Sequence, residues 1–441
     1  MKKIYSILLA MALALSLCAC AGVELPPLPE VTDRPEATEA PDGQIPEQKE
    51  PDPTAPVVEQ GSAAAPSALN SAILVSFQNT TREAYDPEEG TQLILNFSYD
   101  TPVIRMEDRP EAASRINQAI AMLDESFYTG KEYGDGGSGG YNYMLMLAED
   151  NYTYVRDSGS DLPLEYSCTR GARVTRVDQK VFNPVFSYSQ YTGGAHGNYS
   201  DESYVFDTES GERLRLEDLT SDYEGLKSFL VDWMLDKAVN DPDIADCIYP
   251  DTDEQTLREQ LTALLRDGSW YLDDKSLTVF PTLYEIGPYA AGIIEFKVPY
   301  EQLRGRIDDV WFPVPAETDG SISVMPLEEL GNGTTEILDR IVANESGTEL
   351  ALVVRGTVSD VRLSGVYYED FTDSFYELNQ IWLCTKLSDC AVQLVSVVPE
   401  GLPNLMISYR GENGEVQNKL LTQSGLDGRF LLIDDNIAPV G

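Results

Sequence analysis

The sequence TQLILNFSY, residues 91–99, carries the pattern that decides the fold class. Its apolar residues alternate at Leu93, Leu95 and Phe97. This alternation predicts a strand with one buried face. A helix is predicted next, opened by Pro110 and closed by Gly130, because apolar residues recur there at helical spacing, at Ile116, Ile120, Leu123 and Phe127. A strand followed by a helix of this kind predicts a helix that packs on a sheet.

Strand-like and helical segments alternate irregularly around this pair. The strand-like segments are residues 73–77, 164–176, 180–191, 202–207, 277–284 and 292–299. Two apolar helical stripes, which begin at Leu226 and Leu257, follow the capping-box patterns Ser221-x-x-Glu224 and Thr252-x-x-Gln255. Residues 141–154 are ambiguous, and we interpret them as a helix. Because these segments do not form strict βαβ units, residues 71–313 are predicted to be an α+β domain with a largely antiparallel sheet and packed helices.

The C-terminal third has a different pattern. Residues 314–335 contain Pro, Gly, Thr and acidic residues, and we interpret them as a linker. Short β-like runs follow, at residues 350–355, 361–367, 379–384, 391–398, 404–410, 416–423 and 429–433. Seven short strands separated by turn signals predict a small all-β, sandwich-like domain over residues 336–441. An accessory binding or spacer module is the default interpretation.

The N-terminus is typical of an exported protein. Lys2 and Lys3 precede an apolar run at residues 7–19, which is shorter than the roughly 20 residues that span a bilayer. Residues 1–19 are therefore predicted to be a signal peptide. The sequence Leu17-Cys18-Ala19-Cys20 resembles a bacterial lipobox, in which Cys20 would carry the lipid. The alternatives are modification of Cys18 and ordinary secretion with cleavage near residue 21.

Residues 20–70 are predicted to be a Pro- and Glu-rich disordered tether. Residues 21–66 hold 10 of the 26 prolines, and residues 21–70 hold 10 acidic and two basic side chains. Such a segment cannot bury enough apolar surface to offset its ordering entropy. We expect a protein held by its lipid at the extracytoplasmic face of the bacterial membrane. A disordered leader with no spacing role is the alternative.

Composition excludes several classes of function. The chain of 441 residues has a net charge of −43 and a single histidine. A phosphate backbone is repelled by such a charge, so nucleic acid is not an expected partner. One histidine excludes a zinc site with two or more imidazoles, and the acidic strings 241–243 and 251–254 lack the glycine and distal glutamate of an EF-hand. No metal or cofactor is predicted.

Three motifs occur in order. They are Tyr191-Thr-Gly193-Gly194-Ala-His196-Gly-Asn198, then Phe206-Asp-x-x-x-Gly211 with Leu214-x-Leu216-x-Asp218-Leu219, and Tyr284-Glu285-Ile-Gly-Pro288-Tyr289-Ala-Ala-Gly292. Together they resemble the RsiV-type domain, over roughly residues 90–310. That domain forms the extracellular part of the anti-sigma factor RsiV and also precedes the catalytic domain of PdaC-type peptidoglycan deacetylases. The resemblance implies a lysozyme-binding ectodomain. The chain departs from RsiV in having no predicted transmembrane helix or sigma-binding region.

His196 is the candidate for any chemistry in the first motif. Glycines on both sides free the backbone to expose the ring, and histidine is suited to general base catalysis near neutral pH. The alternative is an ordering or binding role in a turn. The string Gly136-Gly-Ser138-Gly-Gly140 matches the G-x-S-x-G pattern of the hydrolase nucleophile elbow. No strand leads into it, so we interpret it as a loop.

Four cysteines remain after Cys18 and Cys20 are set aside. Cys384 and Cys390 flank five residues between two β-like runs, so a disulfide that clamps a hairpin is predicted, worth about 2–3 kcal/mol. A bridge between Cys168 and Cys247 follows only by elimination, and free thiols are the alternative.

The expected function is non-catalytic binding at the cell envelope. The ligand would be a cationic, lysozyme-like protein or cell-wall glycan (peptidoglycan), since the charge of −24 on residues 71–313 favours cationic partners and the 24 tyrosines suit recognition surfaces. The alternative from another class is a cell-wall hydrolase or deacetylase that uses His196.

Overall fold

The computed structural model describes residues 71–130, 139–159, 165–250, 252–331, 335–369, 374–399 and 403–434. The chain divides into two units, residues 1–62 and 63–441, and every described residue lies in the second. The predicted signal peptide, Cys20, the tether and Ser138 lie outside the described residues. In the described ranges, no helix has the length and apolar character needed to cross a membrane.

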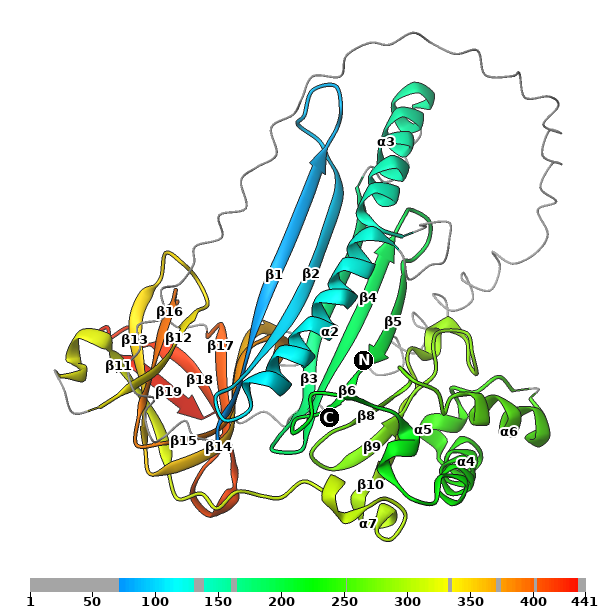
Figure 1. Cartoon of the computed structure of the whole chain (residues 1–441). Coiled ribbons are helices and arrows are strands. Elements are labelled where there is room, and N and C mark those ends of the chain that lie inside the picture. The colour runs from blue at the N-terminus through cyan, green and yellow to red at the C-terminus, as the bar shows by residue number, and fades with distance from the viewer. Residues whose placement is uncertain are drawn as a thin grey trace, which may run out of the picture. The chain divides into compact units, whose positions relative to one another are not determined.

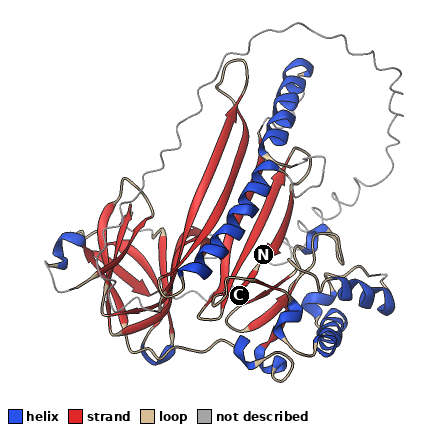
Figure 2. Ribbon diagram, in the orientation of Figure 1, coloured by secondary structure: helices blue, strands red, loops and turns tan. Residues whose placement is uncertain are grey.

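A long sheet organises the described residues (Figures 1 and 2). Its 12 strands follow the order β19-β18-β17-β14-β15-β1-β2-β3-β4-β6-β7, with β5 paired to β4. They are β1 Ile73–Tyr85, β2 Leu93–Met106, β3 Tyr166–Val177, β4 Val181–Tyr191, β5 Asn198–Ser203, β6 Val205–Asp207, β7 Arg213–Leu214, β14 Thr357–Glu369, β15 Ser374–Ser388, β17 Leu405–Arg410, β18 Val416–Gln423 and β19 Phe430–Asp434. Only β2 and β3 pair in parallel in this sheet, so the predicted α+β class with a largely antiparallel sheet is confirmed.

Two helices lie along one face of this sheet: α2 (Pro110–Thr129) and α3 (Tyr141–Ser158). The helix over residues 141–154, which was ambiguous in sequence, is therefore present. The predicted apolar face of α2 is buried in one cluster with residues of β1, β2 and β4, including Ile116, Ile120, Val75, Ile104 and Phe182. At its C-terminal end the ring of Phe127 stacks on that of Phe97, with centroids 4.9 Å apart.

A second layer of helices surrounds a small sheet ordered β10-β9-β8. Its elements are β8 Trp270–Leu272, β9 Ser276–Val279, β10 Phe296–Pro299, α4 Tyr223–Asn240, α5 Pro242–Ala245, α6 Glu254–Ala263, α7 Tyr300–Leu303, and the 3₁₀ turns η3 Leu216–Leu219, η4 Tyr289–Ala291 and η5 Asp309–Trp311. The stripes from Leu226 and Leu257 are buried in its core. The N-caps are Asp222 and Asp253, each one residue later than the predicted Ser221 and Thr252, and their carboxylates accept from the Gly225 and Thr256 N–H groups.

The C-terminal residues form a sandwich. A four-stranded sheet, β11-β13-β16-β12, packs its apolar face on β14, β15 and β17 of the long sheet. Its strands are β11 Ser321–Pro326, β12 Ile337–Val342, β13 Thr348–Arg355 and β16 Ala391–Ser396, and the turns are η6 Leu327–Leu330 and η7 Glu412–Gly414. The segment 314–335, predicted as a linker, thus contains β11, because Ile322 faces the sandwich core and the strand pairs with β13.

The long sheet passes from the N-terminal part into this sandwich. Leu74 and Val75 of β1 pair with Cys384 and Leu383 of β15. Further along β15, the Gln380 side chain accepts from the Val174 N–H at 2.8 Å and donates to the Val174 carbonyl at 3.3 Å. Strands more than 200 residues apart in sequence therefore share one hydrogen-bonded layer.

The predicted disulfide between Cys384 and Cys390 is absent, since both thiols are free and buried. The prediction was wrong because β15, which contains Cys384, and β16, which begins directly after Cys390, do not form a hairpin but belong to different sheets. Burial raises the pKa of the Cys384 thiol to about 12. Cys168 and Cys247 are free as well.

Candidate functional site

The first motif forms the turn between β4 and β5. Tyr191 ends β4, Asn198 begins β5, and these two strands pair through Gln190 and Asn198. Gly193 and Gly194 have φ angles of 88° and 95°, which favour glycine. The Tyr191 hydroxyl donates to the Gly194 carbonyl at 3.2 Å and so ties the turn to its own strand.

The motif from Tyr284 to Gly292, which we term the second motif, lies between β9 and β10, and the stretch from Phe206 to Leu219 is termed the middle motif. Tyr284 has a φ of 65°, an uncommon value for a non-glycine residue, and Pro288 caps the turn η4, which holds Tyr289. Gly292 has a φ of 70°, and a Cβ at this position would lie 3.5 Å from the Tyr199 hydroxyl. The backbone at Gly292 is therefore shaped to pass close to the first motif.

The two motifs meet in a group of four rings, which we term the aromatic cluster: His196, Tyr199, Tyr284 and Tyr289. The rings of His196 and Tyr289 are stacked, with centroids 3.9 Å apart and an interplanar angle of 25°. Tyr199 contacts Tyr289 edge-on at 5.5 Å, and Tyr284 lies 5.9 Å from it. Tyr289 is thus the centre of the cluster.

One backbone carbonyl fixes the orientation of both stacked rings. The Tyr289 hydroxyl donates to the Gly197 carbonyl at 2.9 Å, and Nδ1 of His196 lies 2.9 Å from the same oxygen. Because a carbonyl only accepts, Nδ1 carries the proton in this arrangement, and Nε2 of the neutral ring is the acceptor. A Cβ on Gly197 would come within 2.8 Å of the Gln190 carbonyl, so glycine is required by close packing as well.

The cluster is open to solvent. His196 is exposed, and Tyr284 is 51% exposed. Tyr199 and Tyr289 are half-buried, and burial raises the pKa of the Tyr199 hydroxyl. The cluster therefore presents aromatic faces and hydroxyls at the surface, a combination typical of recognition sites.

Glu285 is a structural anchor of the second motif. Its carboxylate forms a two-point ion pair with the Arg266 guanidinium, at 2.6 and 2.9 Å, and accepts from the Thr282 N–H at 2.9 Å. Burial raises the pKa of the Glu285 carboxyl, but Arg266 and the Thr282 donors lower it by more, so the net pKa is below its ordinary value. Glu285 is therefore held as a carboxylate that fixes the loop.

A polar cavity of about 270 Å³ is lined in part by residues that adjoin the cluster in sequence, since Ser200 follows Tyr199 and Thr282 precedes Tyr284 by two positions. It is lined by Tyr188, Ser200, Asp201, Glu202, Arg266, Asp267, Gly268, Ser269 and Thr282. Arg266 is neutralised by Glu285, and Asp201 by Arg173 at 2.9 Å. Glu202 instead accepts from the Tyr204 hydroxyl at 2.7 Å. Glu202 and Asp267 have no cationic partner among the described residues, so this region carries excess negative charge.

The middle motif is structural. Phe206 and Leu219 are buried in two different core clusters, and Gly211 takes a φ of 75° against the backbone of Ala112. Sequence reasoning did not single out Arg266 or Glu202, because neither belongs to a motif. Tyr199 directly follows the first motif, and this position in the sequence could have identified it as a candidate site residue.

The arrangement suits binding more directly than proton transfer. Within the described ranges no carboxylate is hydrogen-bonded to His196, whose Nδ1 is committed to the backbone of its own turn. General bases of the Ser-His-Asp type use an acidic partner at that nitrogen to orient the ring. What the cluster offers instead is a group of contacting rings, two of them exposed and two half-buried.

Comparisons with known proteins identify a domain family in this chain but no activity. Two solved structures are similar: a DUF3298 family member from Bacteroides fragilis NCTC 9343, 20% identical over 54% of this chain and 95% of that chain with a TM-score of 0.41, and a DUF3298 family protein from Pseudomonas aeruginosa PAO1, 19% identical over 54% and 97% with a TM-score of 0.35. No curated protein matches the chain. Residues 240–301, which include the second motif, match the family described as "Protein of unknown function (DUF3298)", the domain found in RsiV- and PdaC-type proteins.

Proposed function

We propose that this chain is a cell-surface binding protein whose aromatic cluster recognises a cationic, lysozyme-like protein without chemical turnover. The observation that carries the proposal is the stack of the exposed His196 ring on Tyr289, in a part of the chain whose acidic side chains outnumber the basic ones by 44 to 20. The membrane attachment through Cys20, the tether and the extracytoplasmic location belong to the same proposal.

The aromatic cluster supports the proposal through its energetics. Tyrosine supplies a large apolar face and a polar tip with few rotatable bonds, and it is enriched among the residues that dominate protein interfaces. Tyr289 is already fixed by its hydrogen bond to Gly197 and its contacts with three rings. A fixed ring loses little side-chain entropy when a partner binds, so more of its contact energy appears as affinity.

Charge supports the choice of partner. The 44 acidic and 20 basic side chains of residues 71–313 give this part of the chain a net charge of −24, which attracts cations. Complementary fields raise association rates and reject partners of like charge. A basic protein therefore fits this surface better than an acidic one.

The test is calorimetric titration of the full chain in detergent with lysozyme, at low and at raised salt. We expect binding at low salt that weakens as salt screens the charges. An acidic protein of similar size is the matched control and should give no binding heat. Absence of binding to lysozyme at low salt contradicts the proposal.

The same preparation also tests the alternative ligand, cell-wall glycan, and the alternative function, catalysis. Binding of muropeptides but not of lysozyme identifies glycan as the ligand and overturns the choice of a cationic protein. Release of acetate or reducing ends from peptidoglycan, lost in His196→Ala, overturns the non-catalytic part of the proposal.

A further inference from the structure

The polar cavity carries two carboxylates that no cation balances. Arg266 in its lining is paired with Glu285, whereas Glu202 and Asp267 form no ion pair with any residue that the structure describes. Glu202 is half-buried, and removing a carboxylate from water without a counterion is unfavourable. An occupant with a positive charge would offset that cost.

Two contacts hold Glu202 in the lining. Its carboxylate accepts from the Tyr204 hydroxyl at 2.7 Å. Gly268 packs against its stem, since a Cβ on this glycine would lie 3.0 Å from Cγ and 3.2 Å from Oε1 of Glu202. Gly268 has a φ of 89°, and its carbonyl accepts from the Ser203 N–H at 2.9 Å. The glycine therefore leaves the space that the Glu202 side chain occupies.

A buried hydroxyl without a partner belongs to the same lining. Ser269 lines the cavity and is only 5% exposed, yet its hydroxyl makes no hydrogen bond within the described ranges. Buried polar side chains are nearly always hydrogen-bonded, because an unmade bond leaves the cost of desolvation unpaid. An occupant of the cavity would supply the missing partner.

The strong donors of the lining are engaged, whereas acceptors are available. Arg266 donates to the Glu285 carboxylate through both terminal nitrogens, and the Tyr188 hydroxyl donates to Glu202 at 3.5 Å. The Asp267 carboxylate and the Ser269 hydroxyl can each accept a bond from an occupant. A ligand that only donates therefore fits this cavity best.

The geometry favours an ammonium group over other cations. Both oxygens of Glu202 already accept a tyrosine hydroxyl, from Tyr204 and Tyr188. A guanidinium binds a carboxylate best as a planar fork with two parallel bonds, whereas an ammonium is a compact charge with three donors. Among the described residues, no group of three His, Cys, Asp or Glu side chains could hold a metal ion. The volume of about 270 Å³ is also below the roughly 300–1,000 Å³ of sites for drug-sized ligands, and it suits a short alkyl chain.

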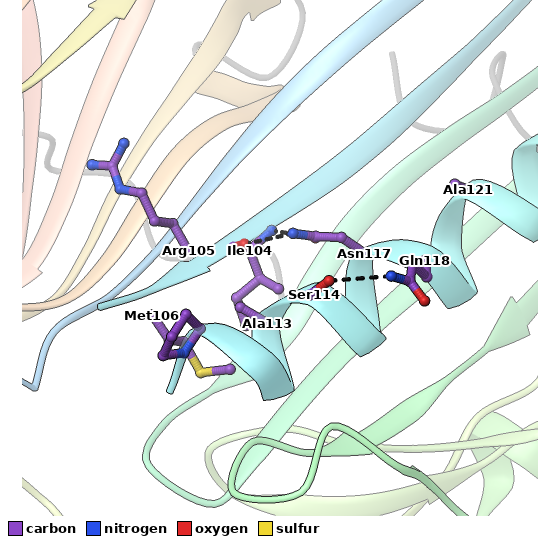
Figure 3. A pocket seen from close by; sticks show the side chains of 9 residues that line it. Ile104, Arg105, Met106, Ala113, Ser114, Asn117, Gln118 and Ala121 are labelled. Atoms are coloured by element: carbon purple, nitrogen blue, oxygen red, sulfur yellow. Dashed lines mark hydrogen bonds between the residues drawn. The ribbon is translucent and has the colours of Figure 1, made fainter. Parts of the chain in front are cut away.

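A larger cavity, of about 480 Å³, lies between the end of β2 and α2 and shows the contrast (Figure 3). The Asn117 side chain in its lining accepts from the Ile104 N–H at 3.0 Å and donates to the Ile104 carbonyl at 2.8 Å. Arg105, the charged residue of that lining, is paired with Asp339 at 3.2 Å. Its charge is therefore balanced, and it shows no preference for an ionic ligand.

We propose that the polar cavity binds a primary alkylammonium group, with Glu202 and Asp267 as its counterions and Ser269 as a hydrogen-bond acceptor. A lysine side chain and a free small amine both carry this group. The choice of a lysine of the cationic partner as its source rests on the proposed function.

The ammonium site is tested with n-butylammonium and the full chain in dodecyl maltoside at low salt. Saturation-transfer NMR, with saturation of the aromatic protons of the protein, measures the dissociation constant. Glu202→Gln/Asp267→Asn removes both charges but keeps an acceptor for Tyr204, and it should raise the dissociation constant at least about tenfold. The matched control is Glu328→Gln/Glu329→Gln, which changes the net charge equally at two exposed positions of η6 and should leave the constant unchanged.

The neutral analogue n-butanol has the same alkyl chain and should bind at least about tenfold more weakly than n-butylammonium. The midpoint of urea unfolding reports whether each variant is folded. The proposal is overturned if n-butylammonium does not bind the wild-type chain, or if the cavity variant binds it as tightly as the wild type.

Calorimetry with lysozyme identifies the source of the ammonium group. A partner lysine predicts that the cavity variant binds lysozyme at least about tenfold more weakly than the η6 variant, and that n-butylammonium competes with lysozyme. If lysozyme binds both variants equally while n-butylammonium separates them, the source is a free amine, and the choice of lysine is overturned although the proposed function stands. If lysozyme does not bind the wild-type chain, the proposed function and the choice of lysine both fail, and the n-butylammonium titration alone decides whether the ammonium site exists.

Discussion

The Tyr289 ring lies flat on the His196 ring, 3.9 Å away, and its hydroxyl donates to the carbonyl of Gly197, the residue next to that histidine. Two loops that are distant in sequence are thereby joined by a stack and a hydrogen bond. This contact makes the aromatic cluster a single unit, and it can be observed directly because the chain has one histidine.

The first prediction concerns that stack. The Hε1 proton of His196 should show an upfield ring-current shift in the proton NMR spectrum. Tyr289→Ala should move the signal towards the position of a free histidine, whereas Tyr289→Phe should leave most of the shift in place because the ring remains. Tyr154→Ala, on α3, is the control. An unchanged signal in Tyr289→Ala would show that the rings are not stacked in solution.

The second prediction concerns a buried ion pair between β3 and α2. Arg170 is fully buried and pairs with Asp124, which also accepts from the Thr101 hydroxyl at 2.6 Å. Asp124→Ala leaves a buried guanidinium without its counterion, so the free energy of unfolding should fall by about 3–5 kcal/mol in urea titrations. Asp232→Ala removes an exposed partner of Arg258 and should cost less than about 1 kcal/mol. Equal losses in the two variants would contradict the assignment.

The third prediction concerns the bridge from Gln380 to Val174. Gln380→Leu leaves one backbone N–H and one carbonyl without partners in a buried layer, at about 1–3 kcal/mol each. The free energy of unfolding should therefore fall by about 2–6 kcal/mol. Gln255→Leu, on the exposed face of α6, should change it by less than about 0.5 kcal/mol. If Gln380→Leu unfolds at the wild-type urea concentration, the bridge does not couple the two regions.

The fourth prediction concerns acid stability. The Asp86 carboxylate accepts four backbone N–H groups in the turn between β1 and β2, and those from Gln92 and Glu89 contribute most to holding its pKa well below the ordinary value. A lowered pKa adds stability above the unfolded pKa of about 3.9, and this stability is lost as pH falls towards the folded pKa.

Asp86→Asn tests this sign. The variant should be less stable than wild type at pH 7, and the difference should shrink as the pH is lowered through the acid range, as measured by urea midpoints. A difference that stays constant with pH would show that the charge of Asp86 plays no part.

Local pattern predicted the elements better than their arrangement. The apolar spacing of Ile116 and Ile120 is sufficient to predict α2, since helix periodicity is a property of neighbouring residues. The pairing of Leu74 with Cys384 depends on contacts across about 310 residues, and nothing near either residue encodes it. The disulfide prediction failed for the same reason, because it assumed that consecutive strands form a hairpin.

The sequence predicted only part of the candidate site. His196 and Tyr289 each stand in a motif, but their stacking could not be derived from spacing. Arg266 holds the second motif through Glu285, yet it lies in no motif and has no distinctive neighbours in sequence. Residues whose role is to position others are defined by tertiary contacts, so the sequence alone does not separate Arg266 from other surface arginines.

The most direct test of the proposed function is the affinity of Tyr284→Ala for lysozyme, by calorimetry at low salt. Tyr284 is 51% exposed in the cluster, and Tyr154, at 59%, is a matched tyrosine on α3. Interface hot spots are enriched in tyrosine and cost about 2 kcal/mol or more when truncated, so Tyr284→Ala should bind at least about tenfold more weakly while Tyr154→Ala keeps wild-type affinity. Wild-type affinity in Tyr284→Ala, or an equal loss in both variants, would contradict recognition by the aromatic cluster.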